Sequence, residues 1–305
     1  MQVLKPAGYF WRSWRTPGTV LYLALSGGHG QLIDGLYVLV ARIRRHPIFV
    51  HHHSFAYIDQ PTMLNRMLFG LLRQANHIVL SAGMGKSLQQ LYGLSRDRVR
   101  VVSNAALFPS LSSAEPGTEP APGPLRIGFL SNITLEKGIV EFFEVLRLLH
   151  TRGVAYQARI AGPVASTVRA AFDQMLATAS NVEYAGAVYD ETKDRFYREL
   201  DVLLFPSKYV NEAEPLVIHE ALRAGVFTIA SDRGAIAEIL GNGAGLALPA
   251  GEFVETATRW ITQTSREPGR LSDLRRSCRQ QAQRIQDTAI VELDRLQEFM
   301  CTSHS

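Results

Sequence analysis

The sequence predicts an α/β protein of two domains, each with a parallel β-sheet covered by helices. From residue 125 on, short apolar segments typical of buried strands alternate with segments of helical spacing, and a shorter alternation precedes residue 110. Between them, LSSAEPGTEPAPGP (111–124) is rich in Pro, Gly, Ser and Glu and lacks periodicity. We therefore expect domains at 1–110 and 125–305, joined by a linker at 111–124.

The second part contains several segments that predict strands and, between them, segments that predict helices. The predicted strands are LRIGFL, YQARIAG, VEYAGAV, DVLLFPS, VFTIAS and GAGLALP. The predicted helices are GIVEFFEVLRLLH, VRAAFDQMLATA, DETKDRFYREL, the end of NEAEPLVIHEALRAG (211–225), GAIAEIL, and a tail expected to be helical throughout 252–300. Parallel sheets of this kind bind ligands at the carboxyl ends of their strands, where helices begin.

The first part repeats this pattern. VLYLALSGGHG (20–30) predicts a strand and a glycine-rich turn, and LIDGLYVLVARIRR predicts an amphipathic helix. PIFVHHHSFAY (47–57) predicts a strand that ends in three histidines. The turn SGGHG is as consistent with a simple turn as with a phosphate-binding loop.

The composition, 46% hydrophobic and 20% charged over 305 residues, is that of an ordinary globular chain. Cys278 and Cys301 have neither disulfide-framework nor metal-site spacing, which fits a reducing, cytoplasmic compartment. Residues 1–124 hold 12 Lys and Arg against 5 Asp and Glu. This basic half favours a phosphorylated substrate or the inner face of an anionic membrane over nucleic acid, although a solvated basic surface explains it equally well.

Two loops that follow predicted strands place polar groups beside the starts of predicted helices. Their residues are Ser131, Asn132, Thr134 and Lys137 after LRIGFL, and Glu212, Leu216 and Val217 after DVLLFPS. Two helix N-termini and a lysine can bind a phosphate or diphosphate, and the alternative for Lys137 is a solvated surface lysine. After a third strand, Gly162 lets the backbone approach a ligand closely.

The segment NEAEPLVIHEALRAG places three glutamates around one predicted helix. Pro215 suits the first turn, Gly225 suits the end, and Glu212 and Glu214 suit the positive end of the helix dipole. These signals do not explain Glu220, because a carboxylate among apolar neighbours is rarely buried unless it is paired. For Glu220 the residues leave a structural ion pair and a ligand contact equally open.

Three segments resemble the donor-binding domain of glycosyltransferase family 4, the retaining group 1 enzymes of GT-B fold. They are GFLSNITLEKGI (128–139), AGP (161–163) and NEAEPLVIHEALRAGVFTIASDRGAIAEIL (211–240). The similarity covers about residues 75–265, and it includes the paired-glutamate spacing of the family between Glu212 and Glu220. It implies two Rossmann-like domains that face a cleft, with a shortened N-terminal domain.

The same resemblance implies a role for each matching residue. Glu212 would bind hydroxyls of the donor sugar, Glu220 would bind the ribose hydroxyls, and Lys137 would stabilise the charge on the departing diphosphate. The other residues expected to bind the donor are Ser131, Asn132, Gly162, Pro215, Leu216 and Val217. Members of the family need no obligatory metal, so neither a metal site nor a cofactor is expected.

Three features depart from the family pattern. Asn132 stands five residues before Lys137, where the family usually has arginine, so the diphosphate site lacks one fixed cation. AEP (213–215) replaces a glycine-rich stretch, which leaves the loop shape at the sugar open. The first domain is shorter than a full acceptor domain, so we expect either a reduced domain or a coding sequence that begins further upstream.

The three histidines of HHHSF need a separate interpretation. Alternation along a strand sends His51 and His53 to one side and His52 to the other, so the three cannot bind one metal ion from a regular strand. The family often has a histidine here that faces the donor sugar, and the resemblance favours His53, then His52, for this catalytic position. The alternative is a histidine satisfied by a backbone hydrogen bond.

These observations predict a retaining glycosyltransferase that uses a nucleotide-sugar donor and a glycan, lipid-linked or growing polysaccharide acceptor of the cell envelope. Two other functions stay open: a degenerate, non-catalytic GT-B subunit that docks on a partner or forms an oligomer, and a nucleotide-sugar epimerase-like enzyme. Asn132 favours the non-catalytic subunit, whereas Lys137, Glu212 and Glu220 favour catalysis. The nucleotide, the sugar and the acceptor stay open.

Overall fold

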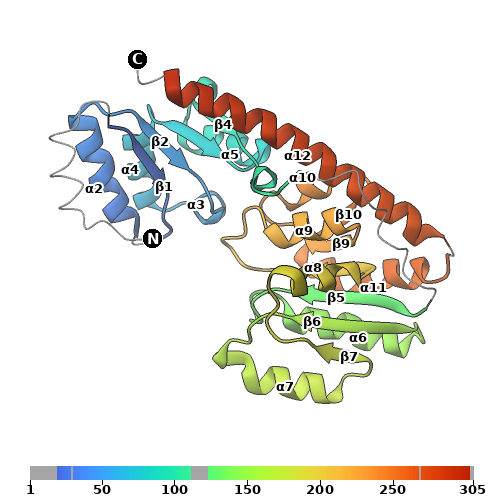
Figure 1. Cartoon of the computed structure of the whole chain (residues 1–305). Helices are drawn as coiled ribbons and strands as arrows, with labels where there is room; N and C mark the ends of the chain where they lie inside the picture. The colour runs from blue at the N-terminus through green and yellow to red at the C-terminus, as the bar shows by residue number, and fades with distance from the viewer. Residues whose placement is uncertain (1–18, 29, 111–122, 268, 303–305) are drawn as a thin grey trace. The chain divides into compact units, whose positions relative to one another are not determined.

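The computed structural model describes residues 19–28, 30–110, 123–267 and 269–302, so the predicted linker lies almost wholly outside the described residues. The chain divides into two compact units. Unit 1 comprises Met1–Ala106 and Thr288–Ser305, and unit 2 comprises Leu107–Asp287. Each unit has its own parallel sheet, and the last helix, α12 (Arg270–Thr302), contributes residues to both (Figure 1).

In unit 1 the described strands form a sheet of order β1-β2-β3-β4. They are β1 (Leu21–Ala24), β2 (Ile48–His51), β3 (Asn76–Val79) and β4 (Val99–Val101). The connections contain α2 (Gly30–Ile43), α3 (Ala56–Asp59), α4 (Met63–Leu72), α5 (Ala82–Tyr92) and η1 (Arg96–Arg98), and η2 (Asn104–Leu107) follows β4. Because all strands are parallel and neighbours follow chain order, right-handed crossovers put α2, α4 and α5 on the same face of the sheet.

The two faces of the unit 1 sheet have different partners. Phe49 and Ile78 pack with Leu296 of α12 on one face. On the other face His77 contacts the Leu72 carbonyl at the end of α4. Alternation along the strands explains this division, because neighbouring residues point to opposite sides.

In unit 2 six parallel strands have the order β10-β9-β8-β5-β6-β7. They are β5 (Leu125–Leu130), β6 (Tyr156–Ala161), β7 (Val182–Tyr184), β8 (Val202–Phe205), β9 (Phe227–Ser231) and β10 (Gly245–Leu248). The chain runs from β5 outward to β7, returns to β8 on the other side of β5, and continues to β10. The order therefore reverses between β5 and β8, which is the switch point at which doubly wound sheets bind ligands.

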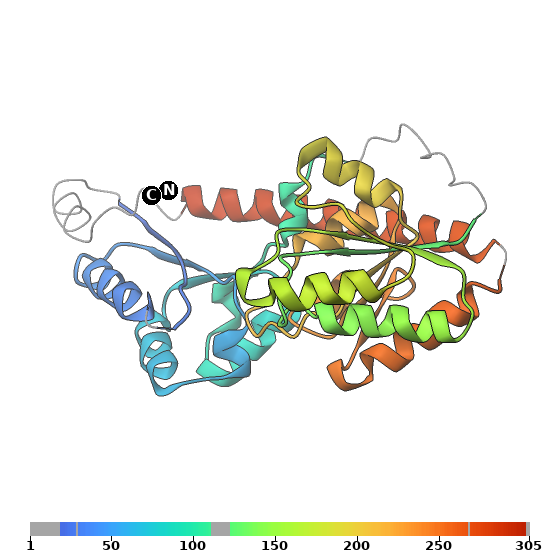
Figure 2. The ribbon, with the colours of Figure 1, turned by 90° about the horizontal axis from the view of Figure 1, so that it is seen from below.

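Helices cover both faces of the unit 2 sheet. They are α6 (Ile139–Thr151), η3 (Ser166–Val168), α7 (Arg169–Thr178), α8 (Asp190–Arg198), α9 (Leu216–Ala224), α10 (Ile236–Leu240), η4 (Ala250–Glu252) and α11 (Phe253–Thr264). Val202 and Leu204 of β8 join the larger apolar cluster with α6 and α11, whereas Leu203 joins a smaller cluster with α8. Figure 2 shows α6 and α7 side by side over one face, where Phe143 contacts Phe172.

The strands and helices predicted for unit 2 are present, and Gly225 ends α9 in the left-handed conformation as expected. Two predictions were wrong in detail. Pro215 is the N-cap of α9 rather than a residue of its first turn. The tail is not helical throughout, because α11 ends at Thr264 and α12 begins at Arg270, directly after Gly269 at φ 85°.

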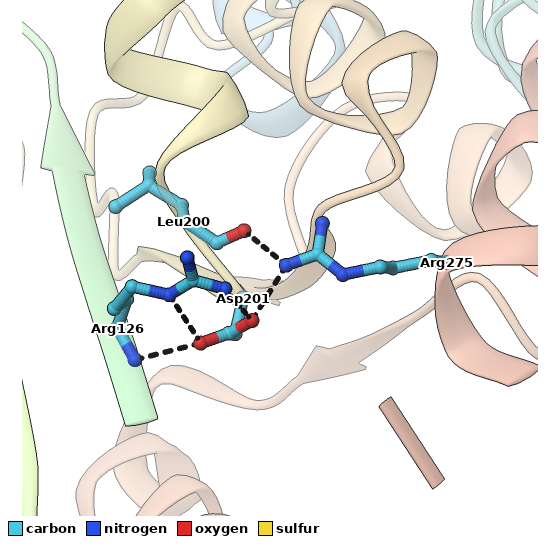
Figure 3. Close-up of polar contacts among 4 residues, drawn as sticks. All are labelled: Arg126, Leu200, Asp201 and Arg275. Atoms are coloured by element: carbon cyan, nitrogen blue, oxygen red, sulfur yellow. Dashed lines mark hydrogen bonds and ion pairs between the residues drawn. The ribbon is translucent and has the colours of Figure 1, made fainter. Parts of the chain in front are cut away.

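A buried carboxylate connects three elements at the amino-terminal edge of the unit 2 sheet (Figure 3). Asp201 accepts hydrogen bonds from the backbone N–H and guanidinium of Arg126 on β5 at 2.6–2.9 Å. Arg275 of α12 donates to the same carboxylate at 2.5 Å and to the Leu200 carbonyl at 2.8 Å. Burial acts to raise the pKa of Asp201, but the hydrogen bonds from Arg126 and the two guanidinium charges outweigh it, so the pKa lies below its ordinary value.

Candidate active site

The loop after β5 positions Lys137. Its backbone N–H donates to Thr134 Oγ1 at 3.1 Å, and Gly138 follows as the N-cap of α6 with φ 83°. A Cβ at position 138 would lie 2.1 Å from the Pro206 carbonyl oxygen. Glycine therefore allows this loop to pack directly against the chain that leaves β8.

Lys137 and Glu212 form an ion pair at the switch point. Lys137 Nζ lies 2.6 Å from Glu212 Oε2, and Ser207 Oγ donates to the same oxygen at 2.8 Å. Glu212 is only 9% exposed, and the ammonium also lies 4.6 Å from the centre of the Tyr209 ring. The two residues are 75 positions apart, and they meet because they follow the two strands that flank the switch point.

A second buried pair holds the segment that contains Glu212. His219 Nε2 on α9 lies 3.0 Å from Glu214 Oε1, and both side chains are buried. Gly234 packs closely against the backbone of the same segment, because a Cβ at Gly234 would lie 2.3 Å from the Ala213 carbonyl oxygen. Neither glutamate lies in the first turn of α9, and each has a side-chain partner: Lys137 and Ser207 contact Glu212, and His219 contacts Glu214.

The start of α9 adds donors to this edge of the sheet. The helix begins at Leu216, so the amides of Leu216 and Val217 have no acceptor within it. The first amides of α6, from Ile139 on, likewise have no acceptor within their helix, and this helix begins shortly after Lys137. Two helix N-termini and one ammonium therefore lie at the carboxyl ends of β5 and β8, an arrangement that suits a diphosphate.

Glu220 has two partners from α8. Lys193 Nζ lies 2.5 Å from Oε1, and the Tyr197 hydroxyl donates to Oε2 at 2.8 Å. Burial and the charge of Glu220 raise the pKa of Tyr197 well above its ordinary value, so the hydroxyl stays a donor. The structural ion pair that the sequence left open is therefore present, and each carboxylate oxygen retains acceptor capacity for a ligand.

Two loops hold residues that the sequence predicts to bind the donor: Asn132 follows β5, and Gly162 follows β6. Gly162 has φ 129°, and a Cβ there would lie 1.9 Å from the Ser131 carbonyl oxygen. The close approach expected at Gly162 is thus made by another protein loop, and a ligand contact there stays a prediction. Asn132 is exposed.

His53 lies in unit 1, just past the end of β2. It is exposed, and its ring centroid lies 4.0 Å from that of His51, as expected for residues on one side of a strand. Burial and the neighbouring His53 lower the pKa of His51 to about 4. His51 is therefore neutral at neutral pH, and its Nδ1 lies 2.5 Å from the Tyr22 hydroxyl.

His52 points to the opposite side and is fully buried. Its Nε2 lies 3.0 Å from His77 Nδ1, its Nδ1 lies 2.9 Å from the Tyr57 hydroxyl, and His77 Nε2 lies 3.1 Å from the Leu72 carbonyl oxygen. A carbonyl can only accept, so His77 is protonated on Nε2, His52 donates through Nε2, and Tyr57 donates to His52 Nδ1. His52 is a core residue satisfied by side chains, not by a backbone carbonyl.

Sequence reasoning missed Ser207, Lys193, Tyr197 and His219 as partners of the glutamates. Lys193 lies 27 positions before Glu220 in a strongly charged helix, and no spacing connects the two. His219 could have been found, because it lies five positions after Glu214 on a helix with little polar surface. A buried imidazole there requires a hydrogen-bond partner.

Across the described ranges, no group of three or more His, Cys, Asp or Glu side chains is arranged to hold a metal ion. None of the helices in those ranges is long and apolar enough to cross a bilayer. Cys278 and Cys301 are free thiols. Burial raises the pKa of Cys278 to about 12, which makes it unreactive.

Comparison with known proteins gives a consistent result for the family and the fold. The model of the glycosyl transferases group 1 matches residues 114–285, more than half of the chain. HepE from Anabaena, solved in complex with UDP, has a TM-score of 0.77 at 16% identity, over 97% of this chain and 82% of that chain. No curated protein sequence matches.

Two other solved structures are similar. The pneumococcal O-GlcNAc transferase GtfA, in complex with UDP and GlcNAc, has a TM-score of 0.74 at 17% identity, over 97% of this chain and 59% of that chain. Sucrose-phosphate synthase from Thermosynechococcus elongatus has a TM-score of 0.66 at 18% identity, over 88% of this chain and 72% of that chain. At these identities the likeness concerns the fold, and it confirms the predicted α/β class and the GT-B architecture.

Proposed function

The chain belongs to the glycosyl transferases group 1, a retaining family of glycosyltransferases, and we propose that it transfers a sugar from a uridine diphosphate sugar to a hydroxyl of a glycan or lipid-linked acceptor. Uridine is supported by the relatives solved with UDP, HepE and GtfA. The observation that supports the site most directly is the Lys137–Glu212 ion pair at the switch point. In this proposal unit 2 binds the donor, and the first domain, 1–110, recognises the acceptor.

The donor diphosphate then lies between the starts of α6 and α9. Lys137 exchanges part of its contact with Glu212 for the diphosphate, the amides of Leu216 and Val217 donate to it, and Glu212 binds sugar hydroxyls. The bond between the anomeric carbon and the diphosphate oxygen breaks with oxocarbenium character. Its electron pair stays on the departing UDP, whose growing charge Lys137 stabilises.

The acceptor oxygen forms the new bond on the same face, and its proton leaves on the departing phosphate. Glu220 binds the ribose hydroxyls with the acceptor capacity that Lys193 and Tyr197 leave on its two oxygens. A role for His53 beside the donor sugar remains a prediction from the family resemblance.

Calorimetric titration with UDP, GDP and ADP tests the nucleotide, and release of UDP from UDP-glucose and UDP-GlcNAc tests the reaction. We expect UDP to bind tightest and Glu220→Gln to weaken it roughly tenfold or more, since a charge-assisted hydrogen bond to the ribose is lost. Lys137→Met should lower kcat about a hundredfold, because an electrostatic contact to the leaving group is lost.

The matched control is Lys208→Met. Lys208 Nζ pairs with Glu141 at 2.6 Å, so this change also removes a lysine from an ion pair in the loop after β8. It should leave UDP release unchanged. Equal turnover of Lys137→Met and Lys208→Met, or binding of none of the three nucleotides, would contradict the proposal.

A further inference from the structure

Helix α2 buries two polar side chains together with Val38 and Ala41 and exposes all of its leucines and isoleucines, whereas a surface helix usually exposes polar residues. Gln31 and Asp34 point inward and are 2% and 5% exposed. The outward side chains include Leu32, Leu36, Leu39 and Ile43, which are 59%, 45%, 45% and 72% exposed. Their spacing of four, three and four residues places them on one stripe along the helix.

Helix α4 continues this surface. Met63, Met67 and Leu71 recur at four-residue spacing and are 79%, 63% and 37% exposed. The two helices lie side by side, since Asn65 donates to Gln31 near their starts and Arg42 donates to the Leu71 carbonyl near their ends, both at 2.6 Å. Both connect neighbouring parallel strands, so their stripes face away from the same side of the sheet. We name these seven apolar residues the α2–α4 face.

A basic cavity adjoins the α2–α4 face at the C-terminal ends of the two helices. It has a volume of about 360 Å³, and its lining includes Arg42, Arg45, His46, Leu71 and Arg98 but no carboxylate. Helices α2 and α4, both described throughout, contain a single carboxylate, Asp34, which accepts hydrogen bonds from Ser26 instead of facing outward. The apolar stripe and its border of arginines thus have no negative charge beside them on these helices.

We propose that the α2–α4 face docks on the surface of an anionic phospholipid bilayer. The stripe enters the boundary between headgroups and acyl chains, and the cavity lined by arginines receives a lipid phosphate. Charge complementarity favours an anionic lipid surface over a second copy of the chain, because α2 and α4 present no outward carboxylate that could pair with the arginines of a second copy. This inference goes beyond sugar transfer and does not depend on the identity of the donor.

Co-sedimentation with vesicles tests the proposal. The full chain should bind vesicles of equal parts phosphatidylcholine and phosphatidylglycerol much more tightly than pure phosphatidylcholine, and added salt should weaken the binding. Leu36→Gln with Met67→Gln should reduce partitioning roughly tenfold or more, since two apolar side chains no longer enter the membrane. Arg45→Gln with Arg98→Gln should reduce it by a similar factor on the anionic vesicles.

Two matched controls separate this surface from general effects. Val291→Gln changes a residue of α12 that is 47% exposed outside the α2–α4 face, and Arg276→Gln removes an exposed charge from unit 2. Both should bind vesicles like the unchanged protein, and all variants should release UDP at the same rate from a soluble donor. Absence of vesicle binding, or equal binding of the face variants and the controls, would overturn the proposal. An oligomer in lipid-free solution that Leu36→Gln with Met67→Gln converts to a monomer would overturn it too.

Discussion

His52 and His77 form a hydrogen-bonded pair in the core of unit 1, and burial keeps both neutral. Burial, with a smaller contribution from the charge of Arg98, lowers the pKa of His77 to about 4, although its hydrogen bond to Leu72 opposes this. An unfolded chain takes up the proton near pH 6.5, whereas the folded chain does so only near pH 4. The contribution of the neutral His77 to folding stability is therefore fully present above pH 6.5, and it is lost as the pH falls towards 4.

We predict that His77→Gln flattens this pH dependence, because glutamine can still donate to Leu72 and accept from His52 but cannot titrate. The protonation difference at His77 corresponds to about 3 kcal/mol between the two limits. Chemical unfolding between pH 7 and pH 4 measures the slope, and His150→Gln, an exposed histidine of α6, is the matched control. Identical slopes for His77→Gln and the unchanged protein would show that His77 is not the titrating site.

Asp201 connects β5, the start of β8 and α12, so a change there affects how these elements pack together. We predict that Asp201→Asn destabilises unit 2 by about 3 kcal/mol at neutral pH, because two guanidinium groups lose their buried partner. The lowered pKa of Asp201 means that its contribution is present above the ordinary carboxyl pKa and is lost as the pH falls below it. Denaturant unfolding of both proteins at pH 7 and pH 3 measures the difference, which should shrink in acid. A constant difference would contradict the charge-based explanation.

Most elements of unit 2 could be predicted from the sequence, because strands such as DVLLFPS are continuous apolar runs and helices such as α6 repeat every three to four residues. The break between α11 and α12 was missed. Both segments have helical spacing. Only a short stretch separates α11, which ends at Thr264, from α12, which begins at Arg270 directly after Gly269. Local composition decides whether an element forms, whereas its ends depend on backbone conformation at single residues.

Helix α12 contributes residues to the hydrophobic cores of both units. Its residues from Thr288 on belong to unit 1, where Leu296 packs with Phe49 and Ile78. We predict that Leu296→Ala costs about 3 kcal/mol in unit 1 through the cavity it leaves. Hydrogen exchange should show lost protection in β2 and β3 and unchanged protection in β5 and β8, with the exposed Val291→Ala as control. Equal loss in both sheets would show that the units unfold together.

The amino-acid pattern was sufficient to predict the α/β class, the order of elements in unit 2, the loops that hold Lys137 and Glu212, and the helix that holds Glu220. These properties follow from local apolar periodicity and from short motifs, which need no knowledge of distant residues. Which groups meet depends on how distant segments of the chain pack together. The order of the strands brings Lys137 into contact with Glu212, 75 positions away. The packing of α8 against α9 brings Lys193 and Tyr197 into contact with Glu220. Tertiary packing also determines that the apolar stripe of α2 faces outward. An amphipathic pattern defines two faces of a helix but does not indicate which of them the sheet covers.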